Sequence, residues 1–449
     1  MLNEKFKIKN GKRTALFNSI YYSLNFLVII FSLNNSLFAQ SVDSLVAEAI
    51  ANNPKLKSLQ YRIQASEKRE ESVDNLPAPN LSVEFSQVPI KEINVFDKAI
   101  SNSISLSQMF PLGGKLNAMA EVERKNTVVE SDNYQSAKVN LIAQVKMTYY
   151  NLWLIDRKID VQRKNILLIQ QIIESVETSY YTNKISQADI LSLQSEIALN
   201  ETQLVILENQ KEAEIYKLEF LLGRQLDSKN IFTVENINSD SSSLHEQKLD
   251  EILIEANPSL KRMTSMIAAE KAMIEANNKE LIPDLMIQGM LMRMPRGMIL
   301  TASSDLNMLE PGTEIMYSLM FSINLPFAPW SINKYKAKEE ELAAGIKSIE
   351  YEKNDMQREM SAKLNEAVVK YKTAASLTKL YRNKVIPLYT KASESQVSEY
   401  QNNKTNVTVV IDSYRMLLMQ QMNYFMAQAD TQMSIAEIEM MIGREMDEF

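Results

Sequence analysis

Four short segments of the chain alternate between apolar and polar residues, over residues 81–88, 101–110, 285–294 and 315–324. In the first, leucine, valine and phenylalanine take every second position, and in the second, serines do so. A period of two predicts β-strands with one wet face and one apolar face.

Two much longer segments repeat their apolar residues at steps of three, four or seven. The first extends from Lys115 to about Thr182, and the second from Asn333 to Asn402, where Pro387 is expected to kink the helix. The first seam comprises Ile142, Val145, Tyr149, Leu152, Ile155, Ile159, Ile166, Ile169, Ile173 and Val176. This spacing predicts coiled-coil helices of ~100 Å at ~1.5 Å per residue, and therefore an elongated molecule.

The chain contains an internal repeat. Five features recur in the same order at offsets that grow from 204 to 220 residues: Asn53-Pro54 as Asn257-Pro258, Pro79 as Pro283, Pro111 as Pro326, Tyr180 as Tyr400, and Gly223-Arg224 as Gly443-Arg444. We therefore expect one mature domain, residues 40–449, built from two repeats (41–227 and 249–447) joined by a polar linker, 228–248.

Residues 1–39 have the pattern of an export signal. A basic start is followed by an apolar run over residues 24–31 and then by Ser36-Leu37-Phe38-Ala39 before Gln40. The alternative is a membrane anchor, but the apolar run is shorter than the ~20 residues that a spanning helix needs. The sequence predicts cleavage near Ala39.

Composition excludes several classes of protein. The chain has no Cys and a single His, which argues against disulfides, thiolate or histidine metal sites, and a lipidated N-terminal cysteine. No cluster of residues offers a nucleophile with a base, so we expect neither an enzyme nor a cofactor. The formal net charge of −7 makes a nucleic-acid partner improbable.

The predicted strands require other copies of the chain. Four strands do not close a barrel, and open sheet edges are not tolerated in lipid. We therefore expect a mainly α protein with membrane β structure: a long coiled-coil α-barrel continuous with a transmembrane β-barrel, four strands per subunit, closed by trimerisation. Such a tube is a conduit.

The sequence resembles the TolC-type outer-membrane efflux proteins. The residues that carry the resemblance are Asn53-Pro54-x-Leu56, Pro79-Asn80-Leu81, Ser105-Leu106-Ser107-Gln108-x-x-Pro111-Leu112-Gly113-Gly114-Lys115, Tyr180-x-x-Asn183-x-x-Ser186-x-x-Asp189-x-Leu191, Gly223-Arg224 and Gly443-Arg444. The segment from Gln108 to Lys115 looks most like the heavy-metal branch. The resemblance implies a homotrimer in the outer membrane lipid of a Gram-negative bacterium, with a large periplasmic extension. It also implies two partners, a periplasmic adaptor (membrane fusion protein) and an inner-membrane transporter of the RND type.

The resemblance also assigns the helix-to-helix turns of the tunnel tip. Asn183 and Asn403 stand where the family usually has glycine, and Asn is the residue that best tolerates a left-handed turn after Gly. The family implies adaptor docking there, at Asn183, Lys184, Ser186, Asn403, Lys404 and Asn406. The alternative is a pair of plain solvated turns.

Two aspartates are candidates for a gate at the tunnel entrance, Asp189 and Asp412. Asp412 stands where the family can carry the second of two acidic residues, whereas Val409 stands at the first. Three copies of Asp412 would form an acidic ring that favours cations. The alternative is that Asp412 is an ordinary exposed helix carboxylate with no role in a gate.

The methionines are unevenly placed, with 4 in residues 1–250 and 21 in residues 251–449. The offset of 204 residues between the repeats is even, so odd positions keep the apolar face in both and even positions keep the opposite face. The even face is expected to line the pore, and it carries the strand methionines: Met286, Met290, Met292, Met294, Met316 and Met320. Thioethers are soft ligands suited to copper(I) or silver, although Met is also a flexible apolar filler. Arg293 lies on the expected lipid face and argues against this assignment of the two faces, unless its long side chain reaches water at the edge of the membrane.

The sequence therefore predicts an exit duct that passes substrates from periplasm to exterior, with copper, silver or other heavy-metal cations as candidate cargo. The alternative is a periplasmic adaptor or a coiled-coil structural protein without a pore. An adaptor normally has one helical hairpin in a β-rich body, whereas here strand pairs and hairpins are duplicated.

Overall fold

The computed structural model describes residues 41–91, 93–180, 187–226, 233–234, 237, 248–294, 314–402 and 404–445. The predicted signal, 1–39, and nearly all of the predicted linker lie outside these residues. The chain forms two compact units, the first of residues 1–51, 144–241 and 373–433 and the second of the remaining residues. Each unit takes segments from both predicted repeats, so the division into repeats stays a prediction.

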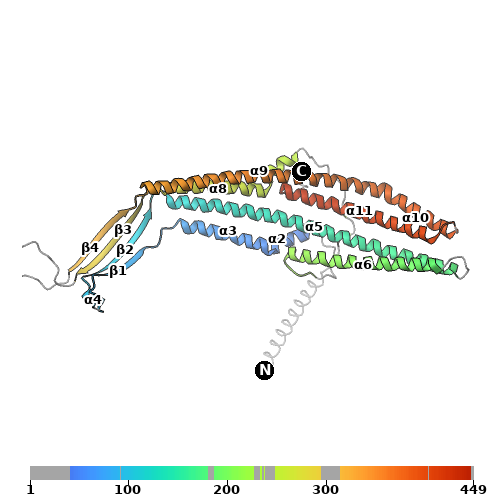
Figure 1. Ribbon diagram of the computed structural model, residues 1–449, viewed down its shortest axis with the longest axis horizontal. Helices are drawn as coiled ribbons and strands as arrows, with labels where there is room; N and C mark the ends of the chain where they lie inside the picture. The colour runs from blue at the N-terminus through green and yellow to red at the C-terminus, as the bar shows by residue number, and fades with distance from the viewer. Residues whose placement is uncertain are drawn as a thin grey trace, which may run out of the picture. The chain divides into compact units, whose positions relative to one another are not determined.

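The second unit contains a four-stranded antiparallel sheet. Its strands are β1 (Asn80–Ser86), β2 (Ser101–Pro111), β3 (Asp284–Met294) and β4 (Glu314–Ile323), and their order in the sheet is their order in the chain (Figure 1). All four predicted strands are confirmed to within two residues. The short helix α4 (Val95–Lys98), between β1 and β2, was not predicted because four residues carry no periodicity.

The connection from β2 to α5 (Lys115–Tyr180) turns at two glycines with positive φ, Gly113 (69°) and Gly114 (76°). Lys115, the first residue of the helix, is buried. Its ammonium lies 2.7 Å from the Asp284 carboxylate and 3.5 Å from that of Glu280. A buried charge is tolerated only when it is paired, so this cluster fixes the start of the helix against the start of β3.

The core of the second unit brings together α7 (Leu249–Ala256), α8 (Pro258–Lys279), α9 (Pro329–Leu380) and the end of α11 (Val407–Ile442). Its most buried side chains are Leu253, Leu260, Leu364, Ala367, Ile438 and Ile442. The Asn257 side chain caps α8 by accepting from the backbone of Ser259 and Leu260, and it donates to the carbonyl of Met441 at 2.7 Å. The repeated Asn-Pro motif therefore fastens one helix start to the end of another.

In the first unit, α6 (Gln187–Leu222) packs beside α5 and α11, with α2 (Val42–Asn52) and α10 (Ile386–Gln401) completing it (Figure 1). One apolar cluster is made of Ile169, Leu193, Val407 and Ile411. A second surrounds Trp153, whose ring meets Phe425 edge to face at 5.8 Å and whose indole donates to the carbonyl of Val234. Ile169 belongs to the apolar seam expected along α5. Five other seam residues are also buried: Val145, Tyr149, Leu152, Ile159 and Ile166. The side chain of Val176, the last predicted seam residue, lies outside the described part.

A π-helical segment, Tyr381–Val385, separates α9 from α10. Pro387 follows it by two residues, and a proline inside a helix both lacks an N–H and crowds the carbonyl four residues earlier. Widening one turn to a π-helix relieves that crowding. The predicted kink site is therefore a local change of helix type.

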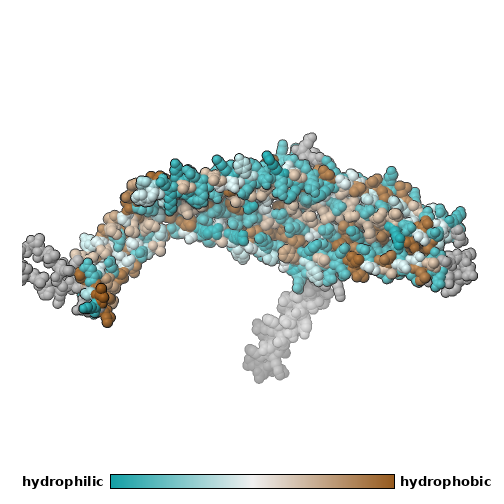
Figure 2. Space-filling model, in the orientation of Figure 1, coloured by the Kyte–Doolittle hydropathy of each residue, from teal (hydrophilic) through white to brown (hydrophobic). Residues whose placement is uncertain are grey.

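Surface character differs between the sheet and α9. On the face drawn in Figure 2, hydrophobic residues gather over the strands and α4, whereas hydrophilic residues cover much of α9. Among the exposed strand residues are Tyr317 (80%), Phe321 (67%) and Leu81 (63%). Within the described part of the chain, none of the helices combines the length and apolar character of a membrane span.

Candidate functional site

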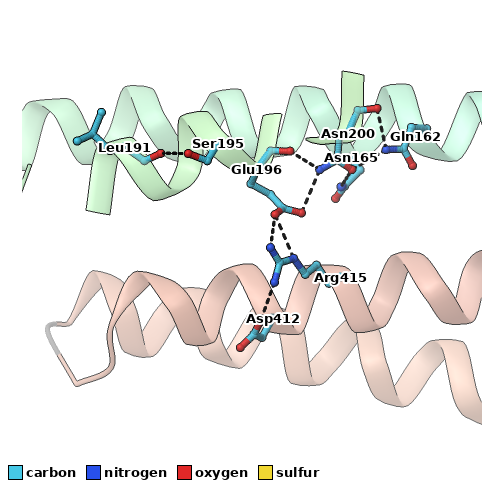
Figure 3. Close-up of polar contacts among 8 residues, drawn as sticks. All are labelled: Gln162, Asn165, Leu191, Ser195, Glu196, Asn200, Asp412 and Arg415. Carbon is cyan, nitrogen blue, oxygen red and sulfur yellow. Dashed lines mark hydrogen bonds and ion pairs between the residues drawn. The ribbon is translucent and has the colours of Figure 1, made fainter. Parts of the chain in front are cut away.

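Glu196 of α6 is a carboxylate held almost out of water, with its side chain 6% exposed. Arg415 of α11 donates to its Oε2 through Nε at 3.0 Å and also through Nη2. Figure 3 shows the guanidinium reaching from one helix to the other, with Asp412 on its far side. These hydrogen bonds to Glu196 raise the pKa of the Arg415 guanidinium above its ordinary value. The pair ties α6 to α11.

A chain of amides continues behind Glu196. Asn200 donates to Glu196 Oε1 at 3.0 Å, and its own Oδ1 accepts from Gln162 at 2.6 Å and from Asn165 at 2.9 Å. All three amide side chains are buried and lie on α5 and α6. These hydrogen bonds offset the free-energy cost of burying the amide groups, because a buried polar group without a partner destabilises the fold. It fixes the register of the two helices beside the apolar cluster around Leu193.

The two gate candidates have different surroundings. Asp412 is exposed and lies 3.3 Å from the Arg415 guanidinium, so its charge is already shared with the ion pair. Asp189 lies in the first turn of α6 and is half-buried. Burial raises the pKa of the Tyr400 phenol, and the charge of Asp189 raises it further, so these two groups are close to each other. Whether either aspartate gates a tunnel stays a prediction.

Of the predicted docking residues, Asn183, Lys184, Ser186 and Asn403 lie outside the described residues. Lys404 and Asn406 are both exposed. The Lys404 amide donates to the carbonyl of Glu399 at 2.9 Å, and Asn406 Oδ1 accepts from the Val409 amide at 3.1 Å. Asn406 therefore caps the start of α11, as expected for an Asn before a helix.

The sheet register gathers the predicted pore-lining methionines on the serine face. Met292 stands between Ser103 and Met316, and Met290 between Ser105 and Ser318. In the same way Gln288 stands between Ser107 and Met320, and Met286 between Met109 and Ser322. Alternation along each strand puts these residues on one side of the sheet. Met294 is the last residue of β3 and follows the same alternation, but its side chain lies outside the described part.

The other face of the sheet is mainly apolar. Across the strands Leu106 follows Leu81, Leu319 follows Gly289, and Tyr317 follows Leu291. Arg293 lies on this face between Asn102 and Ile315, at the end of the sheet distant from the helix junctions. That position at the end of the strand is where a long cationic side chain reaches water.

None of these arrangements supplies a reactive centre. Among the described residues, no group of three or more His, Cys, Asp or Glu side chains is placed to hold a metal ion. The polar network instead holds helices together, and the sheet presents one mainly apolar face and one face of serines and methionines.

Comparisons with known proteins agree with this architecture. A family model described as outer membrane efflux protein matches residues 45–224. CusC, whose solved structures concern folding and transmembrane channel formation, is 16% identical with a TM-score of 0.73, over 91% of this chain and 96% of that one. The open state of the Neisseria gonorrhoeae MtrE outer membrane channel is 14% identical (TM-score 0.70; 90% of this chain, 89% of that one). The Campylobacter jejuni CmeC outer membrane channel is 13% identical (TM-score 0.69; 90% and 85%). At these identities the likeness shows the fold alone. No curated protein matches the chain.

Proposed function

We propose that the chain, which the outer membrane efflux protein model matches over residues 45–224, is a TolC-type exit duct of a tripartite efflux system, passing substrates from periplasm to exterior. The observation that carries this proposal is the sheet: four antiparallel strands with one apolar face and one polar face, each pair leading directly into long helices. Lipid would meet the apolar face, and the polar face would line the pore.

Closure of the pore requires more than one copy. Within the described part of the chain, β1 and β4 are the edges of the sheet, and an open edge in lipid leaves backbone groups unpaired. Pairing β1 of one copy with β4 of the next removes both edges. A homotrimer closed in this way would present three copies of each α6 and α11 to the periplasm.

Cross-linking tests this closure. The chain has no Cys, so paired substitutions report only the introduced thiols. Ser82→Cys in β1 combined with Ser318→Cys in β4 is expected to give covalent trimers on oxidation. If the register between copies differs, Met316→Cys or Met320→Cys should replace Ser318→Cys. The matched control is Ser105→Cys with Ser318→Cys, since Ser105 lies in an interior strand. Cross-links no more frequent for edge pairs than for the control would contradict the closure.

In the first unit, the Glu196–Arg415 pair would hold α6 against α11 and so keep the periplasmic entrance narrow. Asp189 and Asp412 would lie near that entrance. The turns around Asn183–Ser186 and Asn403–Asn406 would dock the periplasmic adaptor, and an RND-type transporter would deliver the cargo. Exposed polar residues at the start of α11 support this assignment.

Soft heavy-metal cations are the candidate cargo, supported by the methionines on the serine face. Replacing Met286, Met290, Met292 and Met294 with leucine removes the thioethers and preserves volume and apolarity. In cells with no other duct, we expect this variant to lose copper and silver resistance while it still inserts as a trimer. Leucine at Met356 and Met360, which pack against the helix core, is the control. Unchanged copper and silver resistance in the strand variant would contradict the proposal that these methionines serve a soft-metal cargo.

A further inference from the structure

One side of α11 carries a run of methionines that the core does not use. Met416, Met419 and Met422 are spaced three residues apart, and Met426 follows one turn later. Met416, Met419 and Met426 are 49%, 47% and 40% exposed. Residues three and four apart on a helix are neighbours on its surface, and methionine is ordinarily a buried residue. Repeated exposure on one helix face therefore calls for a ligand.

The opposite side of α11 makes the packing contacts. Leu417 and Gln428 are buried on the side opposite Met419, whereas Gln420, Ala427 and Ala429 are buried along the two borders of the methionine side. Between these borders Met416 and Met419 stay exposed within the first unit and Met422 is half-buried, so the sulfurs of Met416 and Met419 are not committed to the core.

The charges beside the methionines favour a cation. Arg415 is the residue before Met416 in the sequence, but its guanidinium is turned to the Glu196 carboxylate and also lies 3.3 Å from Asp412. Two carboxylates against one guanidinium leave this cluster with a net negative charge. A monovalent cation next to it is attracted, and the methionines supply the ligand atoms.

We propose that Met416, Met419 and Met422 bind one soft monovalent cation, Ag⁺ or Cu⁺, on the surface of α11. Thioethers are soft ligands that select such ions over hard ones. Neighbouring positions on the helix are about 5–6 Å apart at Cβ, and the three rotatable bonds of methionine let the sulfurs converge on one ion. Met426 extends the same face and offers the next thioether along it. The proposal rests on the proposed duct for its physiological meaning, whereas the binding itself does not require a conducting pore.

The test is an Ag⁺ titration of the purified full chain in detergent, with bound silver counted after dialysis. The absence of Cys and the single His leave thioethers as the main soft ligands, which keeps the stoichiometry interpretable. We expect the triple variant Met416→Leu, Met419→Leu, Met422→Leu to bind about one Ag⁺ fewer per chain than the wild type. Each single variant is expected to weaken that ion's binding about tenfold, which keeps the test open if the triple variant folds poorly.

The matched control replaces Met263, Met356 and Met360, which pack in the helix core, with leucine, and it should bind as much silver as the wild type. Wild-type stoichiometry in the α11 variant would overturn the proposal, as would silver lost only from the strand variant at Met286–Met294. A protein that conducts in bilayers but binds no Ag⁺ on α11 would refute this inference and leave the proposed duct standing. A protein that binds Ag⁺ but does not conduct would refute the duct alone.

Discussion

Replacing Arg415 with leucine is expected to loosen α6 from α11. The change leaves the buried Glu196 carboxylate with one side-chain donor, the amide of Asn200. A hydrogen bond to a charged group contributes about 1.5–3 kcal/mol, and a half-exposed arginine belongs to the lower part of that range. A loss of about 2 kcal/mol corresponds to a roughly 30-fold rise in local opening.

Amide hydrogen exchange in α6 and α11 of the purified trimer measures that opening, and single-channel recording should show a larger open fraction. Arg163→Leu is the matched control. It breaks an exposed pair with Glu208, 2.9 Å apart, between α5 and α6. An exposed pair is worth ~0–1 kcal/mol, so exchange should barely change. Equal effects from the two variants would show that Arg415 forms only another surface ion pair.

Replacing Gly113 with alanine is expected to prevent the β2–α5 connection from folding, and so to abolish the trimer. Gly113 has φ +69°, and a Cβ there would overlap the Ile282 side chain, with Cγ2 only 2.8 Å away. Gly114 has a similar φ of +76°, but nothing lies within 4 Å of its Cβ position. Gly114→Ala should therefore show only the backbone cost of about 1–2 kcal/mol, whereas Gly113→Ala adds a steric clash.

Trimer yield in the outer membrane and thermal unfolding of the extracted protein check this order. Combining Gly113→Ala with Ile282→Ala should restore part of the yield, because it removes the clashing atoms. Gly345→Ala, in an open position inside α9, should be neutral or stabilise by up to about 1 kcal/mol. If Gly113→Ala assembles as well as Gly114→Ala, the close contact with Ile282 is not limiting.

The sheet could be predicted from the sequence because alternation is a local property. The serines of residues 101–107 mark one side of β2, and pairing with a neighbouring strand carries that side across the sheet. The long helices were predictable for the same reason, since the seam that includes Tyr149 and Leu152 keeps its period over many turns. The tip turns could be assigned only through the family resemblance.

The Glu196–Arg415 pair could not be predicted, because 219 residues separate its partners and no motif joins them. One signal was available. Leu193, Glu196, Asn200 and Leu207 follow the helical spacing of a core seam, and all four are buried. A carboxylate and an amide at seam positions indicate a buried polar network, although they do not identify the partner helix. The π-helical turn before Pro387 was likewise foreseen as a kink but not as a change of helix type.

The most direct test of the proposed duct is conductance of the extracted protein. The outer-membrane fraction would be solubilised in mild detergent, sized, and reconstituted into a planar lipid bilayer. We predict a homotrimer that opens discrete channels, with a larger open fraction for Arg415→Leu. A monomer recovered in the soluble periplasmic fraction, or a trimer that leaves the bilayer silent in both forms, would contradict an exit duct.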